Sequence, residues 1–247
     1  MDGGAFPTLI ALITMFFAGG LAAPWNGVVS TLLLTGVILF GILITLMVSK
    51  VLSKTMLKGV PSSFTLELPP YRRPQFGKVI VRSIFDRTLF VLGRAISVAL
   101  PAGAIIWILA NVTIGDVTLL AMISQFLDPF ARLMGLDGVI LLAFLLGFPA
   151  NEIVVPIMIM AYMASGSMND ISDLAVLKSL FLDNGWTWVT AICTMLFCLV
   201  HFPCATTLLT IKKETQDIKW TLLSLLIPTI LGILLCMSVN LVAQLFL

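Results

Sequence analysis

The stretch Gly138–Ala164, GVILLAFLLGFPANEIVVPIMIMAYMA, decides how this chain folds. It is long enough to cross a bilayer, which takes about 20 apolar residues. However, helix-breaking and polar residues interrupt it at 147–152. The two arms, 139–146 and 153–163, would be roughly 12 to 17 Å long at about 1.5 Å per residue. Since each arm reaches only about halfway across a core roughly 30 Å thick, the stretch predicts a re-entrant helical hairpin.

The charges on either side of this stretch also favour a return over a crossing. In the polar segments between residues 111 and 184, six aspartates face two basic residues, Arg132 and Lys178. In contrast, residues 50–87 carry eight of the 14 Lys and Arg of the chain. The positive-inside rule places this basic segment in the cytoplasm and both flanks of the hairpin outside. The six aspartates are Asp116, Asp128, Asp137, Asp170, Asp173 and Asp183.

Composition sets the class of protein. The chain has 247 residues, 60% of them hydrophobic and 11% charged, with a formal net charge of +2 and a mean hydropathy of +1.12. The high hydrophobic fraction excludes an ordinary soluble domain. The nearly even charge balance gives no sign of a basic surface for nucleic acid. We expect an all-α, polytopic integral membrane protein with about five transmembrane helices plus the hairpin. The expected spans are residues 6–23, 28–52, 88–112, 186–211 and 220–247.

The fourth expected span, like the hairpin, is interrupted by helix-breaking residues. The run 186–211 begins with Trp186, which we expect at the membrane interface, and residues 201–207 break it. Helix breaks in a bilayer are tolerated where the freed backbone is buried in protein or lines a cavity, and transporter sites are often built from them. The residues expected to break helices are Gly147, Pro149, Pro203 and Pro101. The segment 114–136 predicts an interfacial helix broken at Asp128-Pro129.

Four polar residues at the two breaks are candidates for an ion path. Glu152 is the acid that lies within the deep apolar runs, and Asn151 precedes it. His201 is the single histidine, and Cys204 follows it by three residues. Carboxylate, imidazole and thiolate together suit a divalent transition metal. The alternatives are that Glu152 and Asn151 cap the second arm and that His201 and Cys204 are packing residues.

Two short sequence patterns complete this picture. Phe-Pro followed by a small residue occurs in both breaks, at 148–150 and 202–204, and again at 6–8, which hints at a degenerate repeat. The chain contains no P-loop, zincin or nucleophile-elbow motif. We therefore predict no catalytic residue, no enzyme activity and no bound cofactor.

Three motifs resemble the membrane domain of the ferrous iron transport protein B family, and they occur in the same order and spacing. They are ELPPYRRP at 67–74, GFPANEIVV at 147–155 and FPCATTLLTIKKET at 202–215. The resemblance implies that residues 1–52 end a first Gate (nucleoside-recognition-type) module. Residues 53–87 would then form a basic cytoplasmic linker with an amphipathic helix. Residues 88–247 would form the second Gate module and a C-terminal helix.

The same resemblance implies part of a ferrous iron permease in the bacterial cytoplasmic membrane. Fe²⁺ would be the transported ion, and GTP would act only through a GTPase domain that we expect to be absent from this chain. The expected partners are the lipid bilayer and either the rest of the transporter, meaning the GTPase domain and first Gate module, or a homo-oligomer. No nucleic acid is expected. In the family a Lys also occurs where Asn151 stands, which favours Glu152 as the ligand.

Two alternative functions fit the same residues. The chain could be an assembly or scaffold unit that packs against a separate GTPase-bearing chain and carries no ion. It could also be a Gate-type transporter of an organic solute such as a nucleoside.

Overall fold

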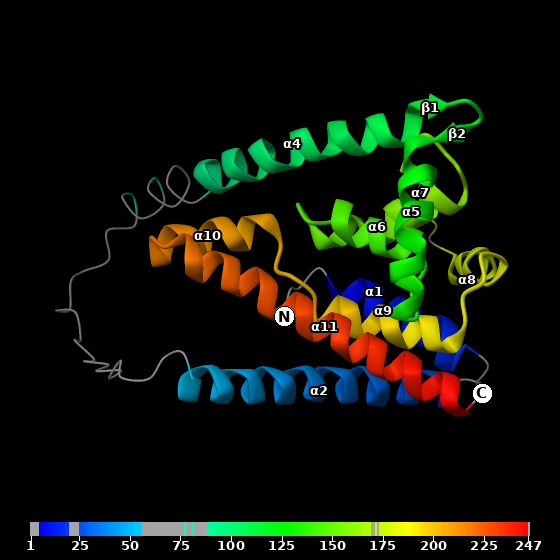
Figure 1. Cartoon of the computed structure of the whole chain (residues 1–247), viewed down its shortest axis with the longest axis horizontal. Coiled ribbons are helices and arrows are strands. Elements are labelled where there is room, and N and C mark those ends of the chain that lie inside the picture. The colour runs from blue at the N-terminus through cyan, green and yellow to red at the C-terminus, as the bar shows by residue number, and fades with distance from the viewer. Residues whose placement is uncertain are drawn as a thin grey trace.

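Helices make up almost all of the fold (Figure 1). The computed structural model describes residues 5–19, 25–55, 77, 81, 88–168, 171 and 173–246. The elements are α1 (Ala5–Ile13), the π-helical turn η1 (Thr14–Ala18), α2 (Trp25–Thr55), α4 (Phe90–Asn111), β1 (Thr113–Ile114), β2 (Val117–Thr118), α5 (Leu119–Leu133), α6 (Gly138–Leu146), the 3₁₀ turn η3 (Asn151–Ile153), α7 (Val154–Tyr162), α8 (Leu174–Asp183), α9 (Trp188–Val200), α10 (Ala205–Thr215) and α11 (Ile218–Phe246). Since β1 and β2 form just one short antiparallel pair, the all-α prediction is confirmed.

The long helices have the length and composition of membrane spans. Within the described residues, α2, the α9–α10 pair and α11 are each long and apolar enough to cross, and a fourth span results if the bent α5–α6 pair counts as one. Only 6% of the most apolar window of α2 and 11% of that of α11 are buried in the protein. These surfaces suit contact with lipid, and the multi-pass class is confirmed. The figure of about five crossings stays a prediction.

The predicted helical hairpin forms the centre of the core. Its first arm is α6, and its second is η3 followed by α7, so both arms lie within a residue or two of the predicted limits. The side chains of Ile140, Phe144, Ile157 and Met158 are each at most 1% exposed. Apolar side chains on nearly all sides are what a wholly buried helix requires. The hairpin is therefore buried along most of its length, except near its tip.

A close backbone approach fixes the start of the hairpin against α5. The axes of α5 and α6 differ by 107°. A Cβ at Gly138 would lie 1.9 Å from the Ser124 carbonyl oxygen, so only glycine fits there. The Gly138 N–H donates to Asp128 Oδ1 at 3.1 Å. On its outer side Asp128 also pairs with Arg132 at 2.6 Å. The C-terminal end of α5 is capped by Asn240 of α11, whose amide donates to the Arg132 carbonyl at 3.0 Å.

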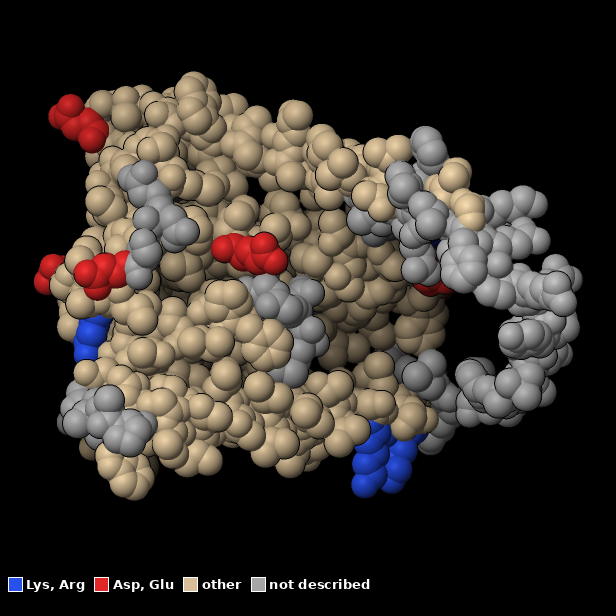
Figure 2. All heavy atoms as spheres, turned by 180° about the vertical axis from the view of Figure 1, so that it is seen from behind, with Lys and Arg blue, Asp and Glu red and all other residues tan. Residues whose placement is uncertain are grey.

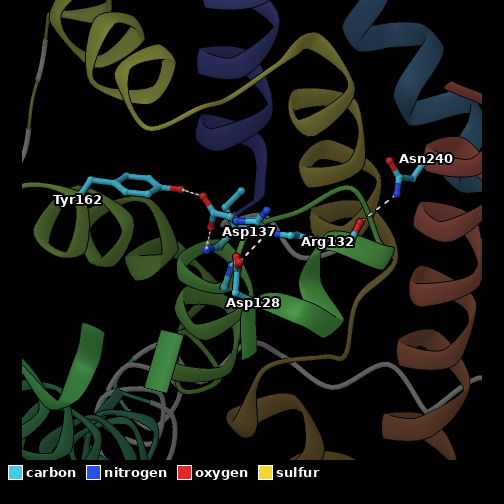
Figure 3. Close-up of polar contacts among 7 residues, drawn as sticks. Asp128, Arg132, Asp137, Tyr162 and Asn240 are labelled. Atoms are coloured by element: carbon cyan, nitrogen blue, oxygen red, sulfur yellow. Dashed lines mark hydrogen bonds and ion pairs between the residues drawn. The ribbon is translucent and has the colours of Figure 1, made fainter. Parts of the chain in front are cut away.

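A polar clamp joins the two ends of the hairpin (Figure 3). Asp137 caps α6 by accepting from the Ile140 N–H at 2.7 Å. Its other carboxylate oxygen accepts from the Tyr162 hydroxyl at the end of α7, and the Trp186 indole donates to the same hydroxyl at 2.8 Å. Trp186 is 3% exposed and stacks on Phe181 of α8 at 4.3 Å. Trp186 is thus a core residue of the protein, and its expected depth at the membrane interface stays a prediction.

Prolines inside helices provide further corrections. The expected break at Pro101 is wrong, because α4 is continuous from Phe90 to Asn111. Pro129 likewise lies inside α5 and does not break it. A proline removes one hydrogen bond of a helix, and neighbouring groups can restore it in a membrane helix. Most of the predicted linker 53–87, with its amphipathic helix, lies outside the described residues.

The clamp generates a prediction about stability. Asp137→Ala removes the cap of α6, which costs about 1 kcal/mol, and leaves the buried Tyr162 hydroxyl without its acceptor, which costs a further 1–3 kcal/mol or so. Asp137→Asn keeps one acceptor oxygen, enough for the Ile140 N–H or the Tyr162 hydroxyl but not for both, so its loss of stability should be smaller than that of the alanine variant. Thermal unfolding in detergent, followed by circular dichroism, measures the difference. Equal melting temperatures for the alanine variant and the wild type would contradict the clamp.

The same residue predicts a pH dependence. Burial in the turn before α6 raises the pKa of Asp137 above its ordinary 3.8, although its hydrogen bonds to Tyr162 and Ile140 oppose the shift. The folded protein therefore holds this proton more tightly than the unfolded chain does. Its contribution to stability is complete below pH 3.8 or so and is lost as the pH rises through the raised pKa. Asp137→Asn should remove this part of the pH dependence of the melting temperature.

Candidate functional site

The second break separates α9 from α10 as the sequence predicts. α9 ends at Val200, and α10 begins at Ala205. His201 has φ −65° and ψ 178°, and Cys204 has φ −61° and ψ 159°, so the chain between the helices is extended. Pro203 favours this conformation, since a proline disfavours the helical region for the residue before it. The predicted breaks at Gly147-Pro149 and at Pro203 are thus both present.

The two breaks meet in space. The Ala205 N–H, at the start of α10, donates to the Phe148 carbonyl oxygen in the hairpin tip at 2.9 Å. The rings of Phe148 and Phe202 lie 5.7 Å apart between centroids. Figure 1 shows the tip end of α6 beside the beginning of α10. The two Phe-Pro tripeptides noted in the sequence therefore form one junction between segments more than fifty residues apart.

His201 lies in an aromatic enclosure beside this junction. It is 8% exposed, and its ring centroid lies 5.1 Å from Phe202, 5.2 Å from Phe144 and 5.9 Å from Phe197. Its Nδ1 lies 3.0 Å from the Cys198 carbonyl oxygen. A carbonyl only accepts, so Nδ1 carries the proton and Nε2 is the basic nitrogen of the ring. Because Phe144 belongs to α6, the hairpin helps to enclose the histidine.

Cys204 lies at the start of α10 next to two hydroxyls. Its Sγ is 3.1 Å from Thr206 Oγ1 and 3.1 Å from Thr207 Oγ1. The side chain is half-buried. A soft sulfur with two oxygens nearby can interact with a borderline divalent cation such as Fe²⁺.

The polar residues of the tip differ in exposure. Asn151 is 6% exposed and thus buried. The side chain of Glu152, the next residue in η3, is exposed. Among the described residues, no three His, Cys, Asp or Glu side chains lie close enough together to hold a metal ion. The junction is made by Phe148, Phe202 and Ala205, and no described contact joins Glu152 to His201 or Cys204. The arrangement thus offers separate weak ligands along the breaks.

A cavity opens on the other side of the second break. It has a volume of about 610 Å³ and lies between α2, the α9–α10 break and α11. His201, Pro203 and Thr207 form its wall on the side of the break. The break therefore contacts the hairpin tip on one side and a cavity on the other.

Sequence reasoning missed the aromatic residues of this site. Phe144 and Phe197 enclose His201, and Phe148 supplies the carbonyl of the junction. A signal for Phe197 was present, because a residue four positions before His201 lies on the same face of a helix. The repeated Phe-Pro pairs were also a signal for Phe148. No sequence pattern indicated Phe144, since it lies in a uniformly apolar helix.

Comparisons with known proteins give the family. The Gate family, described as "Nucleoside recognition", matches residues 92–217, which include both breaks. The family described as "Ferrous iron transport protein B C terminus" matches residues 34–86. No solved structure matches the chain significantly.

Several relatives are named "Fe(2+) transporter FeoB". The relative from Staphylococcus aureus (strain MSSA476) is 29% identical over 87% of this chain. The relative from Leptospira interrogans (serovar Lai) is 27% identical over 88% of this chain, and that from Methanocaldococcus jannaschii is 26% identical over 94%. The matches cover 32%, 34% and 35% of these relatives, so the chain spans about a third of the length of the curated relatives it matches. The chain belongs to the Gate family and corresponds to the C-terminal part of the ferrous iron transport protein B membrane region.

Proposed function

We propose that this chain forms part of a ferrous iron permease, in which the hairpin tip and the break between α9 and α10 line the path of the ion. The names of the relatives support iron as the cargo. The observation that carries the path is the junction between the Phe148 carbonyl and the Ala205 N–H. It brings two helix breaks together, and such breaks line the substrate sites of many transporters.

The weak ligand set suits transit better than storage. An ion in a permease must bind well enough to enter and weakly enough to leave. Cys204 and the Thr206 and Thr207 hydroxyls would interact with Fe²⁺ at the break, and the Glu152 carboxylate would attract it at the tip. His201 would contribute Nε2, and Asn151 would support the tip as a buried amide. Waters and backbone carbonyls would supply the other ligands.

The location and partners of the permease are part of the same proposal. The chain would lie in the bacterial cytoplasmic membrane with residues 53–87 in the cytoplasm, because basic loops stay on that side. It would work with the remainder of the transporter, including a first Gate module and a GTPase domain. GTP hydrolysis would then control the path from outside this chain.

Substitutions at the two breaks test the ion path. Cys204→Ser replaces a soft ligand by a hard one, and Glu152→Gln removes the tip charge. Each should lower the initial rate of ⁵⁵Fe²⁺ uptake about tenfold, which corresponds to ~1.4 kcal/mol in the barrier. The substitutions are made at the chromosomal locus, and uptake is measured in cells kept under reducing conditions.

Matched controls separate this effect from general damage. Glu214→Gln removes an exposed acid at the end of α10, and Cys193→Ala removes a buried thiol between α9 and α11. Both should transport at close to the wild-type rate. Wild-type uptake in the Cys204 and Glu152 variants, at equal amounts in the membrane, would refute the assignment of these residues.

Ala205→Pro tests the junction itself. Proline is tolerated at the first residue of a helix, and Cys204 already has the extended backbone that proline requires of its predecessor. The variant should therefore keep α10 and lose only the hydrogen bond to Phe148. Phe148 is half-buried, so leaving its carbonyl without this donor should cost at most about 1–3 kcal/mol, and we expect a lower melting temperature and severalfold slower Fe²⁺ uptake. Ala205→Gly keeps the N–H and serves as the control; equal uptake in the two variants would rule out a role for the junction.

A further inference from the structure

The cavity beside the second break occupies one half of the length of the long helices. Its wall on α2 runs from Gly41, near the middle of that helix, to Ser53, which is roughly 18 Å at about 1.5 Å per residue. A Cβ at Gly41 would lie 3.0 Å from Leu199 Cδ2, so α2 and α9 are in close contact at this level. On α11 the wall runs from Ser224 to Leu231, in the first half of that helix. The cavity therefore extends from mid-depth toward the end of α2 and the start of α11.

The lysines near this end indicate which side of the membrane the cavity faces. Lys50 and Lys54 lie toward the end of α2, and Lys212 and Lys213 lie in the last turn of α10. Figure 1 shows the end of α2, the end of α10 and the beginning of α11 on the same side of the fold. Figure 2 shows basic side chains gathered at the lower right, which is that side seen from behind. None of these lysines lines the cavity, but they place its end on the expected cytoplasmic side.

Hydroxyl groups form a row along the α2 wall. Thr45, Ser49 and Ser53 repeat every four residues, so they lie on one face of the helix, and all three line the cavity. The Thr45 hydroxyl donates to the Gly41 carbonyl at 2.8 Å, and the Ser53 hydroxyl donates to the Lys50 carbonyl at 3.0 Å. A hydroxyl has one proton and two lone pairs. The oxygens of Thr45 and Ser53 can therefore only accept hydrogen bonds from the cavity.

Backbone carbonyls at the end of α9 lie in the wall on the side of the break. The last four carbonyls of a helix have no N–H of the same helix to accept from. In α9, the Phe197 carbonyl accepts from the His201 N–H at 2.7 Å, and the Cys198 carbonyl accepts from the His201 ring at 3.0 Å. No backbone N–H of the described residues donates to the next two carbonyls, those of Leu199 and Val200. Both of these residues line the cavity.

Pro228 removes a donor from a further carbonyl in α11. A proline has no N–H, so it cannot make the helix hydrogen bond to the carbonyl four residues earlier, which here is that of Ser224. Pro228 and Ser224 both line the cavity. In a membrane, freed backbone groups are tolerated where they are buried in protein or line a water-filled cavity. The carbonyls on two walls and the hydroxyls on the third therefore favour water as the content of this cavity.

The wall suits a hydrated divalent cation. Its described residues include no Lys, Arg, Asp or Glu. The waters around a cation point their hydrogens outward, where the carbonyl and hydroxyl oxygens of the wall can accept them. An ion with six waters needs roughly 200 Å³ at about 30 Å³ per water, and the cavity has about 610 Å³. An uncharged wall binds such an ion weakly, and weak binding lets an ion leave.

We propose that this cavity is a water-filled inner vestibule through which hydrated Fe²⁺ leaves the second break. Thr207 connects the two places, because its hydroxyl lies 3.1 Å from Cys204 Sγ and the residue also lines the cavity. From there the ion passes the row of Thr45, Ser49 and Ser53 to the cytoplasmic side. The inference rests on the proposed function, and it adds the inner half of the ion path and three residues of α2.

A thiol introduced at Ser49 tests whether the cavity holds water. Methanethiosulfonates react with the thiolate, which forms in water far more readily than in apolar surroundings. Ser49→Cys is compared with Leu46→Cys, since Leu46 is 65% exposed on α2 and does not line the cavity. Inverted vesicles from cells carrying each variant are treated with the membrane-impermeant 2-(trimethylammonium)ethyl methanethiosulfonate. Peptide mass spectrometry, which separates the introduced thiol from the native ones, should show labelling at least tenfold faster in Ser49→Cys.

A pair of variants at the same position tests whether the ion passes Ser49. Ser49→Lys and Ser49→Gln introduce side chains of similar size that differ in charge. A fixed positive charge in a narrow vestibule repels a divalent cation, so the initial rate of ⁵⁵Fe²⁺ uptake should be about tenfold lower in Ser49→Lys than in Ser49→Gln. Uptake is measured in cells with equal amounts of the two variants in the membrane. A purely structural role of Ser49 would not produce this dependence on charge.

Two results would overturn the vestibule. Equally slow labelling of Ser49→Cys and Leu46→Cys would show that lipid or protein fills the cavity. Fast labelling of Ser49→Cys with equal uptake in Ser49→Lys and Ser49→Gln would show that the cavity is wet but lies off the ion path. These results are separate from the test of Cys204 and Glu152, because wild-type uptake in the variants of those residues would refute their role and leave a charge effect at Ser49 unaffected.

Discussion

The hydrogen bond between the Ala205 N–H and the Phe148 carbonyl is the contact on which the site depends. A helix that breaks inside a membrane leaves backbone groups without partners, and lipid offers none. Here each of two breaks supplies what the other lacks, since the start of α10 has an N–H to give and the hairpin tip has a carbonyl to accept it. The rings of Phe148 and Phe202 also pack against each other at this junction, 5.7 Å apart between centroids. The need to satisfy the backbone thus brings together segments that lie far apart in the sequence.

The opposite end of the hairpin is fixed by a different kind of contact. Asp137 and Tyr162 join the beginning of α6 to the end of α7, and Trp186 holds Tyr162 from outside the hairpin. Between this clamp and the tip, α6 and α7 are packed with apolar side chains. The hairpin is therefore fixed at both ends, by the clamp at its base and by the junction at its tip.

The sequence predicted the two breaks well and the surroundings of their polar residues poorly. Gly, Pro and polar residues inside apolar runs located the hairpin and the break before α10 almost to the residue. The hydroxyls and the thiol at Cys204 could also be expected. The exposure of Glu152 could not, because it depends on which helices pack against the tip. Pro101 was misjudged since a proline can stay in a helix when neighbouring groups compensate. The burial of Trp186 could not be expected either, because α8, which packs against it, lies in a segment that reads as a polar loop. The turn Gly115-Asp116 between two β-prone pairs was a usable hairpin signal.

The polar side chains of the second break lie in two different surroundings. Cys204 lies beside the Thr206 and Thr207 hydroxyls at the start of α10, and these are the groups that we propose to interact with a divalent cation. His201 also lines the cavity between α2, α10 and α11, but the rings of Phe144, Phe197 and Phe202 leave only 8% of it exposed. In the proposed path, an ion at this break would therefore meet the thiol and the hydroxyls before the imidazole.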